Sequence, residues 1–178
     1  METAELKTHD PLIEECRQGN SLAQFRLYNQ YSKAMLNLAF RLTGNREDAE
    51  DILQESFVEC FRNLDSFREE STFGAWLKKI VINRGINHVK KKKPDIQIMD
   101  TIPDKIEDED DNEAVHDINE INRNIQLLPD GYRIVLTLYL LEGYDHSEIA
   151  QITGLTESTS KSQYSRAKEK LRSMLKRR

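Results

Sequence analysis

The sequence has few of the features that mark secreted, membrane-spanning or metal-binding proteins. Its 178 residues contain only two cysteines, Cys16 and Cys60. Both occupy apolar helical positions, which indicates buried thiols, because a disulfide framework or a metal site would need more ligands in closer clusters. No apolar run approaches the roughly 20 residues that span a bilayer. The first ten residues, METAELKTHD, form no apolar signal segment, so we expect a cytoplasmic protein.

The sequence also lacks a recognisable catalytic constellation. It contains no nucleophile–base pair, no metal cluster and no phosphate-binding loop. Its four histidines are scattered, and we interpret them as surface or capping groups: His9, His88, His116 and His146. We therefore expect no enzymatic activity, no cofactor, no metal site and no small-molecule substrate.

Charge is unevenly distributed along the chain. Hydrophobic residues make up 38% and charged residues 32%, which favours small helical units joined by a polar linker over one large globule. Residues 94–117 hold ten acidic side chains and one lysine, a net charge of −9. The whole chain carries −5, so the remainder carries +4, clustered at Lys90–Lys93 and from Lys161 to Arg178. This segregation predicts anionic partners at two places, with a mostly disordered acidic linker between them.

Helical periodicity and capping signals predict an all-α protein on both sides of this linker. Asp10-Pro11 begins a short helix, and Ser21 with Gln24 forms a capping-box pattern for the next helix, whose apolar face includes Phe25. A third helix is capped by Asn45 and runs to about residue 63. A fourth runs from about residue 72 to 91. We expect domains at residues 10–93 and 118–178, joined by the linker at 94–117.

The third helix carries polar residues on the side opposite its apolar stripe: Asp48, Asp51, Gln54 and Glu55. Acidic residues near a helix N-terminus interact favourably with the helix dipole, and this effect explains the presence of Asp48. The dipole effect fades within the first turn, so it does not explain Glu55.

The fourth helix combines one aromatic, two amides and two cations at steps of three or four residues: Trp76, Lys79, Asn83, Asn87 and Lys90. Cations hold phosphates, amides read base edges and rings stack on unpaired bases, so this strip suits opened DNA strands. An amphipathic helix with a solvated polar face would explain the same residues. A polar loop, Phe67 to Ser71, precedes the helix.

The C-terminal part predicts a helix-turn-helix. Asp145 and Glu148 form a capping box, Gly154 supplies the turn, and a long basic helix follows. One side of that helix carries polar residues suited to base edges and phosphates in a major groove: Thr159, Lys161, Ser162, Gln163, Arg166 and Lys168. A plain helical hairpin is the alternative, and the small Ala150 and the basic second helix favour DNA binding.

In the order in which these motifs occur, the chain resembles the extracytoplasmic-function group of sigma-70 factors. The segment DAEDILQESF, residues 48–57, resembles the part of region 2 that docks on the clamp helices of the RNA polymerase β′ subunit. Leu64-Asp65-Ser66-Phe67-Arg68, with Phe73, Trp76-Leu77 and Asn83, resembles the part that opens and reads the −10 element. Region 4 of the family reads the −35 element. The chain resembles this region at Leu128-Pro129, Arg133, Glu142-Gly143, Glu148-Ile149-Ala150, Gly154 and Ser165-Arg166-Ala167.

The resemblance implies a promoter-specificity subunit. Its implied partners are core RNA polymerase (the β′ clamp helices and the β subunit), promoter DNA and an anti-sigma factor. It assigns docking to Asp48, Asp51, Gln54 and Glu55. Together with the polar strips described above, it predicts −10 binding by Phe67, Arg68, Ser71, Trp76, Lys79, Asn83, Asn87 and Lys90, and −35 binding by the six residues of the basic helix.

Two positions depart from the family pattern. Ser160 stands where an apolar β-branched residue is usual, and Gln163 stands where a basic residue is common, which predicts an altered −35 preference. A stand-alone helix-turn-helix regulator that never joins polymerase is the alternative function. Such a regulator has no need of the acidic side of the third helix, and this feature favours the sigma factor.

Overall fold

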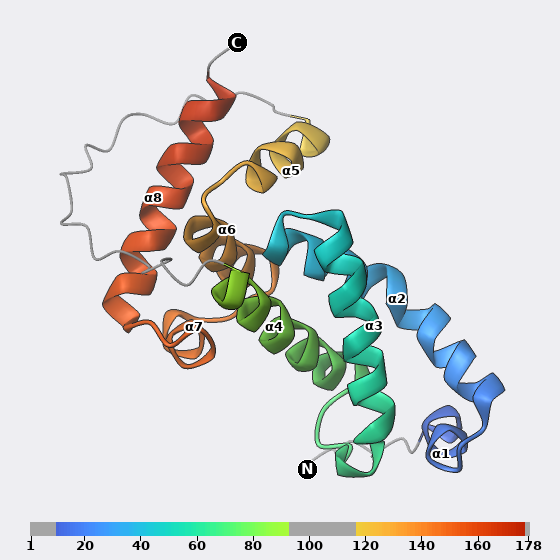
Figure 1. The fold of residues 1–178 in the computed structure, drawn as a ribbon. Helices are drawn as coiled ribbons and strands as arrows, with labels where there is room; N and C mark the ends of the chain where they lie inside the picture. Colours follow the sequence, from blue (N-terminus) through green and yellow to red (C-terminus); the bar gives the residue numbers. More distant parts are fainter. Residues whose placement is uncertain (1–9, 93–116, 177–178) are drawn as a thin grey trace, which may run out of the picture. The chain divides into compact units, whose positions relative to one another are not determined.

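The computed structural model describes residues 10–92 and 117–176, and these residues form helices joined by short turns (Figure 1). No β-strand occurs among them, and the all-α class expected from the sequence is confirmed. The helices group into two compact units, which we describe separately. The first comprises the chain up to Phe40 together with Asn45–Gly85, and the second comprises Arg41–Gly44 and the chain from Ile86 onward.

These units differ from the expected domains, because residues 41–44 and the last turns of the fourth helix group with the C-terminal helices. The domain boundaries at 93 and 118 remain a prediction. Of the acidic linker predicted at 94–117, only Asp117 lies within the described residues, where its side chain accepts a hydrogen bond from the Asn119 amide and begins a helix. The predicted disorder of the linker concerns residues outside the described part of the chain.

The N-terminal helices are α1 (Pro11–Arg17), α2 (Ser21–Thr43), α3 (Arg46–Arg62), the short 3-10 helix η1 (Leu64–Ser66) and α4 (Phe73–Lys92). Asp10 caps α1 as predicted. The cap of α2 is Asn20 and not Ser21: the Asn20 side chain accepts hydrogen bonds from the amides of Leu22 and Ala23 at 3.0 and 3.1 Å. Ser21 is already the first residue of the helix, so the capping-box prediction there was one residue out of register.

The core of the first unit is lined by α2, α3 and α4. Its most buried apolar residues include Ala23, Leu27, Leu38, Ile52, Phe57, Cys60, Leu77 and Val81. Phe25 does not join them, since 60% of its surface is exposed. At 3.6 residues per turn, a residue two positions from the buried Ala23 lies on the opposite side of α2.

The C-terminal helices are α5 (Ile118–Gln126), α6 (Asp130–Leu136), a π-helical turn η2 (Thr137–Leu141), α7 (His146–Thr153) and α8 (Glu157–Leu175). A buried cluster of Ile125, Leu128, Leu136 and Ala167 joins α5, α6 and α8. The π-helical turn η2 directly continues α6 and ends this apolar stretch of the chain.

The turn between α7 and α8 has the predicted chemistry. Asp145 and Glu148 form the complete capping box of α7, and Gly154 ends this helix with a φ of +78°. Glycine adopts this left-handed conformation without the steric cost that a β-carbon brings. Thr156 then caps α8 by accepting a hydrogen bond from the Thr159 amide at 3.0 Å. The helix-turn-helix therefore forms from local signals at both ends of the turn.

Candidate nucleic-acid interface

The acidic side of α3 is solvent-exposed at Asp51, Gln54 and Glu55, and Asp48 is half-buried in the first turn. Glu55 is not a free carboxylate. It accepts a hydrogen bond from Arg84 Nη1 at 2.7 Å, and the same guanidinium donates through Nε to Glu59 at 2.6 Å. The side chain of Glu55 is 62% exposed, so it stays accessible to a partner while it is paired. Sequence reasoning missed Arg84, which lies 29 residues from Glu55.

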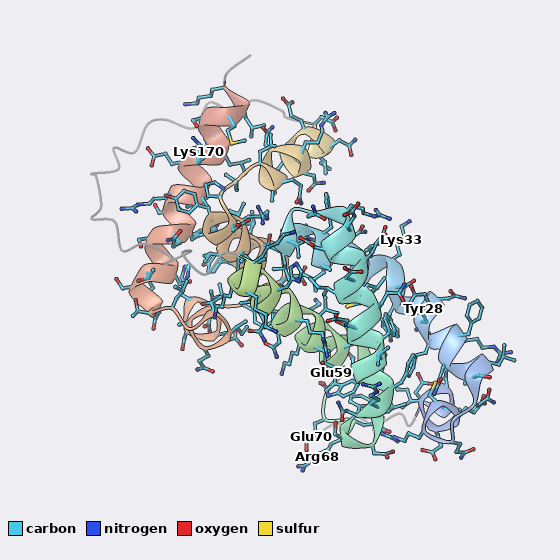
Figure 2. The ribbon with its side chains drawn as sticks, viewed as in Figure 1. Tyr28, Lys33, Glu59, Arg68, Glu70 and Lys170 are labelled. Carbon is cyan, nitrogen blue, oxygen red and sulfur yellow. The ribbon has the colours of Figure 1, made fainter. Side chains whose placement is uncertain are left out.

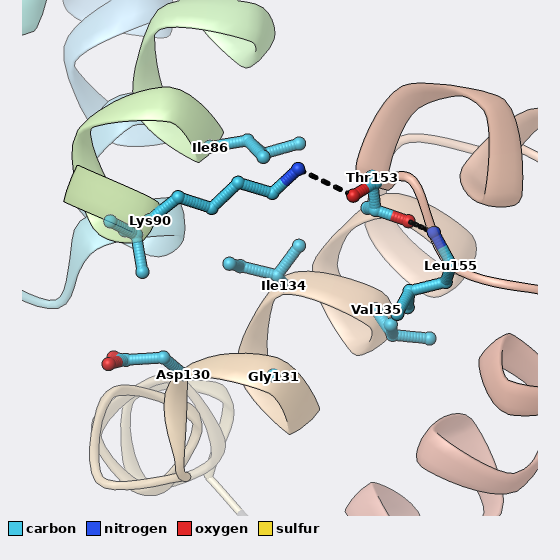
Figure 3. A pocket seen from close by; sticks show the side chains of 9 residues that line it. Ile86, Lys90, Asp130, Gly131, Ile134, Val135, Thr153 and Leu155 are labelled. Carbon is cyan, nitrogen blue, oxygen red and sulfur yellow. Dashed lines mark hydrogen bonds between the residues drawn. The ribbon is translucent and has the colours of Figure 1, made fainter. Parts of the chain in front are cut away.

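The strip predicted along α4 forms one side of that helix. Lys79, Asn83, Asn87 and Lys90 are exposed, and Trp76 is half-buried at its N-terminal end. Two amides and two cations are thus presented in a row beside one aromatic ring. Lys90 also has a partner within the second unit, because its ammonium donates to the Thr153 carbonyl oxygen at 2.6 Å (Figure 3).

The loop from η1 to α4 separates exposed and buried residues. Arg68 and Ser71 are exposed, and Figure 2 shows the Arg68 side chain extending outward from the loop. Phe67 is only 5% exposed and packs against Phe73 and Trp76, with ring centroids 5.7 and 5.3 Å away. We had placed Phe67 among the DNA-binding residues. In this conformation its ring belongs to the core and cannot stack on a base.

The predicted recognition side of α8 is also divided. Lys161 is exposed, and Ser162, Arg166 and Lys168 are half-exposed. Thr159 and Gln163, in contrast, are only 8% and 5% exposed. The strip inferred from the sequence was too wide for one face of a helix, and these two side chains are not presented to solvent.

The physical reason is the register of α8. Ser160 and Ala167 are fully buried, and Gln163 lies between them at helical steps of three and four, so the three share the inward side. Gln163 Oε1 is buried and has no hydrogen-bond partner within the described residues.

Ser160, which departs from the family pattern, has a specific partner. His146 Nδ1 lies 2.9 Å from the Ser160 hydroxyl, across the turn of the helix-turn-helix. The imidazole stacks on Tyr139, with centroids 4.4 Å apart, and Tyr164 lies 4.4 Å from Tyr139. The hydrogen bond thus joins α7 to α8, and the aromatic contacts run from α7 through Tyr139 of η2 to α8, at a position where the family usually has an apolar residue. The sequence signal for His146 was its position next to the Asp145 cap, which we interpreted as surface or capping only.

Burial lowers the pKa of His146, and the ammonium of Lys161 lowers it further. The carboxylates of Glu157 and Asp145 oppose this shift. The net direction is downward from the ordinary value near 6.5, so the imidazole is mainly neutral at pH 7. A neutral ring can accept or donate one hydrogen bond at Nδ1, as the contact with Ser160 requires.

Comparison with known proteins identifies the family. The profile of sigma-70 region 2 matches residues 27–94, and that of sigma-70 region 4 matches residues 118–171. The ECF RNA polymerase sigma factor SigW of Bacillus subtilis is 30% identical over 176 residues, which cover 92% of this chain and 94% of SigW. This chain belongs to the extracytoplasmic-function sigma factors.

A second relative agrees with this assignment, and a solved structure agrees with the fold. The ECF RNA polymerase sigma-E factor of Haemophilus influenzae is 30% identical to this sigma factor over 179 residues, covering 93% of this chain and 94% of that one. The solved structure of the sigma factor RpoE with the anti-sigma factor NepR, from Bartonella quintana, has a TM-score of 0.57 at 24% identity. The match covers 85% of this chain and 96% of the RpoE chain, and it supports the fold. The stand-alone regulator considered from the sequence is therefore not favoured.

One cavity of this sigma factor lies among helices of the second unit. The cavity in Figure 3 has a volume of about 20 Å³ and an apolar lining that includes Ile86, Ile134 and Val135 of the second unit. That is space for about one water molecule. Within residues 10–92 and 117–176, no three side chains of the metal-binding types come together. Nor is any helix in these residues long and apolar enough to cross a membrane.

Proposed function

We propose that this sigma factor uses three surfaces in promoter recognition. The exposed acidic side of α3 docks on the β′ clamp helices of core RNA polymerase. The strip on α4 and the preceding loop hold the opened −10 strand, and the exposed side of α8 contacts the −35 duplex. The observation that carries the proposal is the presentation of amides and cations in one exposed row on α4, on a chain whose family initiates transcription.

The docking proposal is supported by the exposure of Asp51, Gln54 and Glu55 on adjoining turns of one helix. A basic coiled coil would complement this charge. Glu55 also accepts a hydrogen bond from Arg84, so a substitution there would disturb the fold as well as docking. Asp51 is therefore the better position for a test. Asp51→Lys should weaken binding to core polymerase strongly, since like charges placed across an interface are costly.

The matched control for docking is Glu15→Lys, which makes the same change of charge at an exposed position of α1. Binding of both variants to purified core polymerase is measured by titration, and their helicity by circular dichroism. Equal affinity of Asp51→Lys and wild type would remove α3 from the interface.

The −10 proposal is supported by chemistry and by energetic balance. Extracting one base from the duplex costs a few kcal/mol, and one base–aromatic stack returns about 1–3 kcal/mol. The balance is close, so hydrogen bonds from Asn83 and Asn87 and charge from Lys79 are needed to hold the strand. Trp76 is the aromatic residue of this set that lies partly at the surface. Phe67, being buried, contributes as support for the loop.

A fluorescent base analogue in the −10 non-template strand reports opening directly. Asn83→Ala, and shortening of the loop at residues 67–71, should block opening while core binding and −35 contact persist. Opening by both variants at the wild-type rate would remove α4 and the loop from strand capture.

For the −35 element, we propose that Lys161 and Lys168 contact phosphates and that Ser162 and Arg166 reach base edges. Thr159 and Gln163 are left out of this set because both are buried. Selection of a promoter library with an Arg166→Ala variant tests the assignment, which predicts a changed −35 preference.

Two broader roles complete the proposal. The solved structure of similar fold from Bartonella quintana contains the sigma factor RpoE bound to the anti-sigma factor NepR. By analogy, we propose that an anti-sigma factor binds this chain. We also propose that the chain has no catalytic activity of its own and acts in the cytoplasm, where the polymerase supplies the chemistry.

A further inference from the structure

The loop at residues 67–71 is held by an arginine of α1. Arg17 lies in the last turn of α1, and its Nη2 donates to the Phe67 carbonyl oxygen at 2.7 Å. Its Nη1 lies 3.2 Å from Glu69 Oε1 and 3.4 Å from Glu14 Oε2. The side chains of Arg17 and Glu69 are each only 19% exposed. These contacts join positions about 50 residues apart and are largely shielded from water.

The backbone at Glu69 needs such support. Its φ is +57°, and among the described residues it is the single non-glycine residue with a positive φ. A left-handed conformation is unfavourable for a residue with a β-carbon and persists where surrounding contacts impose it. The carboxylate of Glu69 is one end of the Arg17 contact, so the ion pair acts directly on the strained residue.

The second contact of Arg17 fixes the aromatic side of the loop. Phe67, whose carbonyl oxygen accepts from Arg17, packs its ring on Trp76 with centroids 5.3 Å apart. Trp76 is the first residue of the strip on α4. A shift of the loop would therefore move the Phe67 ring away from Trp76 and change how the loop meets the strip on α4.

We propose that Arg17 is a positioning residue for the loop that receives the opened −10 strand, an inference that rests on the function proposed above for that loop. Its guanidinium holds Phe67 and Glu69 in place, so that the exposed Arg68 and Ser71 stand ready for DNA. A direct phosphate contact by Arg17 does not fit, because its guanidinium already faces a carbonyl oxygen and two carboxylates in a shielded position.

The first test needs no DNA. Trp76 is the only tryptophan in the chain, so quenching of its fluorescence by acrylamide reports how well the loop covers it. Two variants separate geometry from charge: Arg17→Gln removes the cation, and Arg17→Lys keeps the charge but lacks the planar fork that reaches both partners. Both should increase quenching. Arg26→Gln, at an exposed position of α2, should not.

The second test uses the holoenzyme and the base-analogue assay. Losing a charged hydrogen bond of this kind should slow opening about tenfold in both Arg17 variants, with affinity for core polymerase unchanged. Asn83→Ala serves as the reference for the function of the loop and strip. Circular dichroism and thermal unfolding show that each variant is folded before it is assayed.

The possible failures can be told apart. Unchanged quenching in both Arg17 variants would overturn the positioning role, whatever the DNA result. Increased quenching with opening at the wild-type rate, while Asn83→Ala opens slowly, would overturn the inference and leave the proposed function standing. Wild-type opening by Asn83→Ala as well would overturn the proposed function and the inference together. Full recovery of both readouts by Arg17→Lys would show that charge alone suffices and would also overturn it.

Discussion

Arg84 links the proposed docking surface on α3 to α4, the helix that carries the proposed DNA-binding strip, and its removal gives a graded prediction. Its guanidinium donates to Glu55 at 2.7 Å and to Glu59 at 2.6 Å. The three side chains are 34%, 62% and 36% exposed, so solvent screens both pairs. Exposed ion pairs contribute about 0.2–1 kcal/mol each. Arg84→Gln should therefore lower the free energy of unfolding by about 1 kcal/mol, an estimate from those exposed-pair values.

For a unit of this size, about 1 kcal/mol corresponds to a decrease in Tm of roughly 4–8 °C, which a thermal melt measures. The same substitution frees two carboxylates on the docking side, so affinity for core polymerase should be kept or increased, with a steeper salt dependence. Arg62→Gln, at the exposed end of α3, is the matched control. A loss of about 3–5 kcal/mol, the size expected for a broken buried pair, would refute the reasoning. So would a loss of polymerase affinity as large as that of Glu55→Gln.

Three further predictions concern charge and protonation. Replacing Lys161 and Lys168 by Gln should weaken promoter binding across sequences and reduce the salt slope by about one unit per lost phosphate contact at most; an unchanged slope would contradict this. The lowered pKa of His146 means that its stabilising contribution is present above pH 6.5 and lost as the pH falls, because protonation then favours the unfolded state. Thermal melts between pH 7 and pH 5 should show this loss, and it should be smaller in His146→Gln; equal pH dependence in both proteins would exclude the imidazole as its source. Burial raises the pKa of Cys60 from 9.0 to about 12, so the stabilising contribution of this thiol is present below pH 9 and lost as the pH rises towards 12. At pH 8 the native thiol should react with a disulfide reagent only as fast as the protein opens; immediate reaction would contradict its burial.

The features that the sequence predicted correctly are those set by nearby residues. Asp10, the Asp145–Glu148 capping box and Gly154 act within one turn of their own helix, so their chemistry can be recognised without knowing the fold. The order of the motifs was enough to predict the family, because the two family regions match this chain in the same order.

Features that depend on distant contacts could not be predicted. Periodicity alone does not fix which edge of a wide polar strip turns inward, and Gln163 is buried because it shares a side of α8 with Ser160. The contacts of Arg84 with Glu55 and of Arg17 with Glu69 join residues 29 and 52 positions apart, and their formation depends on how the helices pack. These ion pairs involve ordinary surface residue types, which leave no local pattern in the sequence.

The central claim is that this chain directs core RNA polymerase to promoters through a −10 and a −35 contact. Purified chain and core polymerase are incubated with a randomised promoter library, and the 5′ ends of the transcripts are sequenced. We expect transcripts that begin downstream of two shared sequence elements. We also expect that Asp51→Lys abolishes these transcripts and that Arg166→Ala changes the upstream element alone. Transcripts that begin at the same positions with core polymerase alone, or that share no upstream elements, would contradict the account.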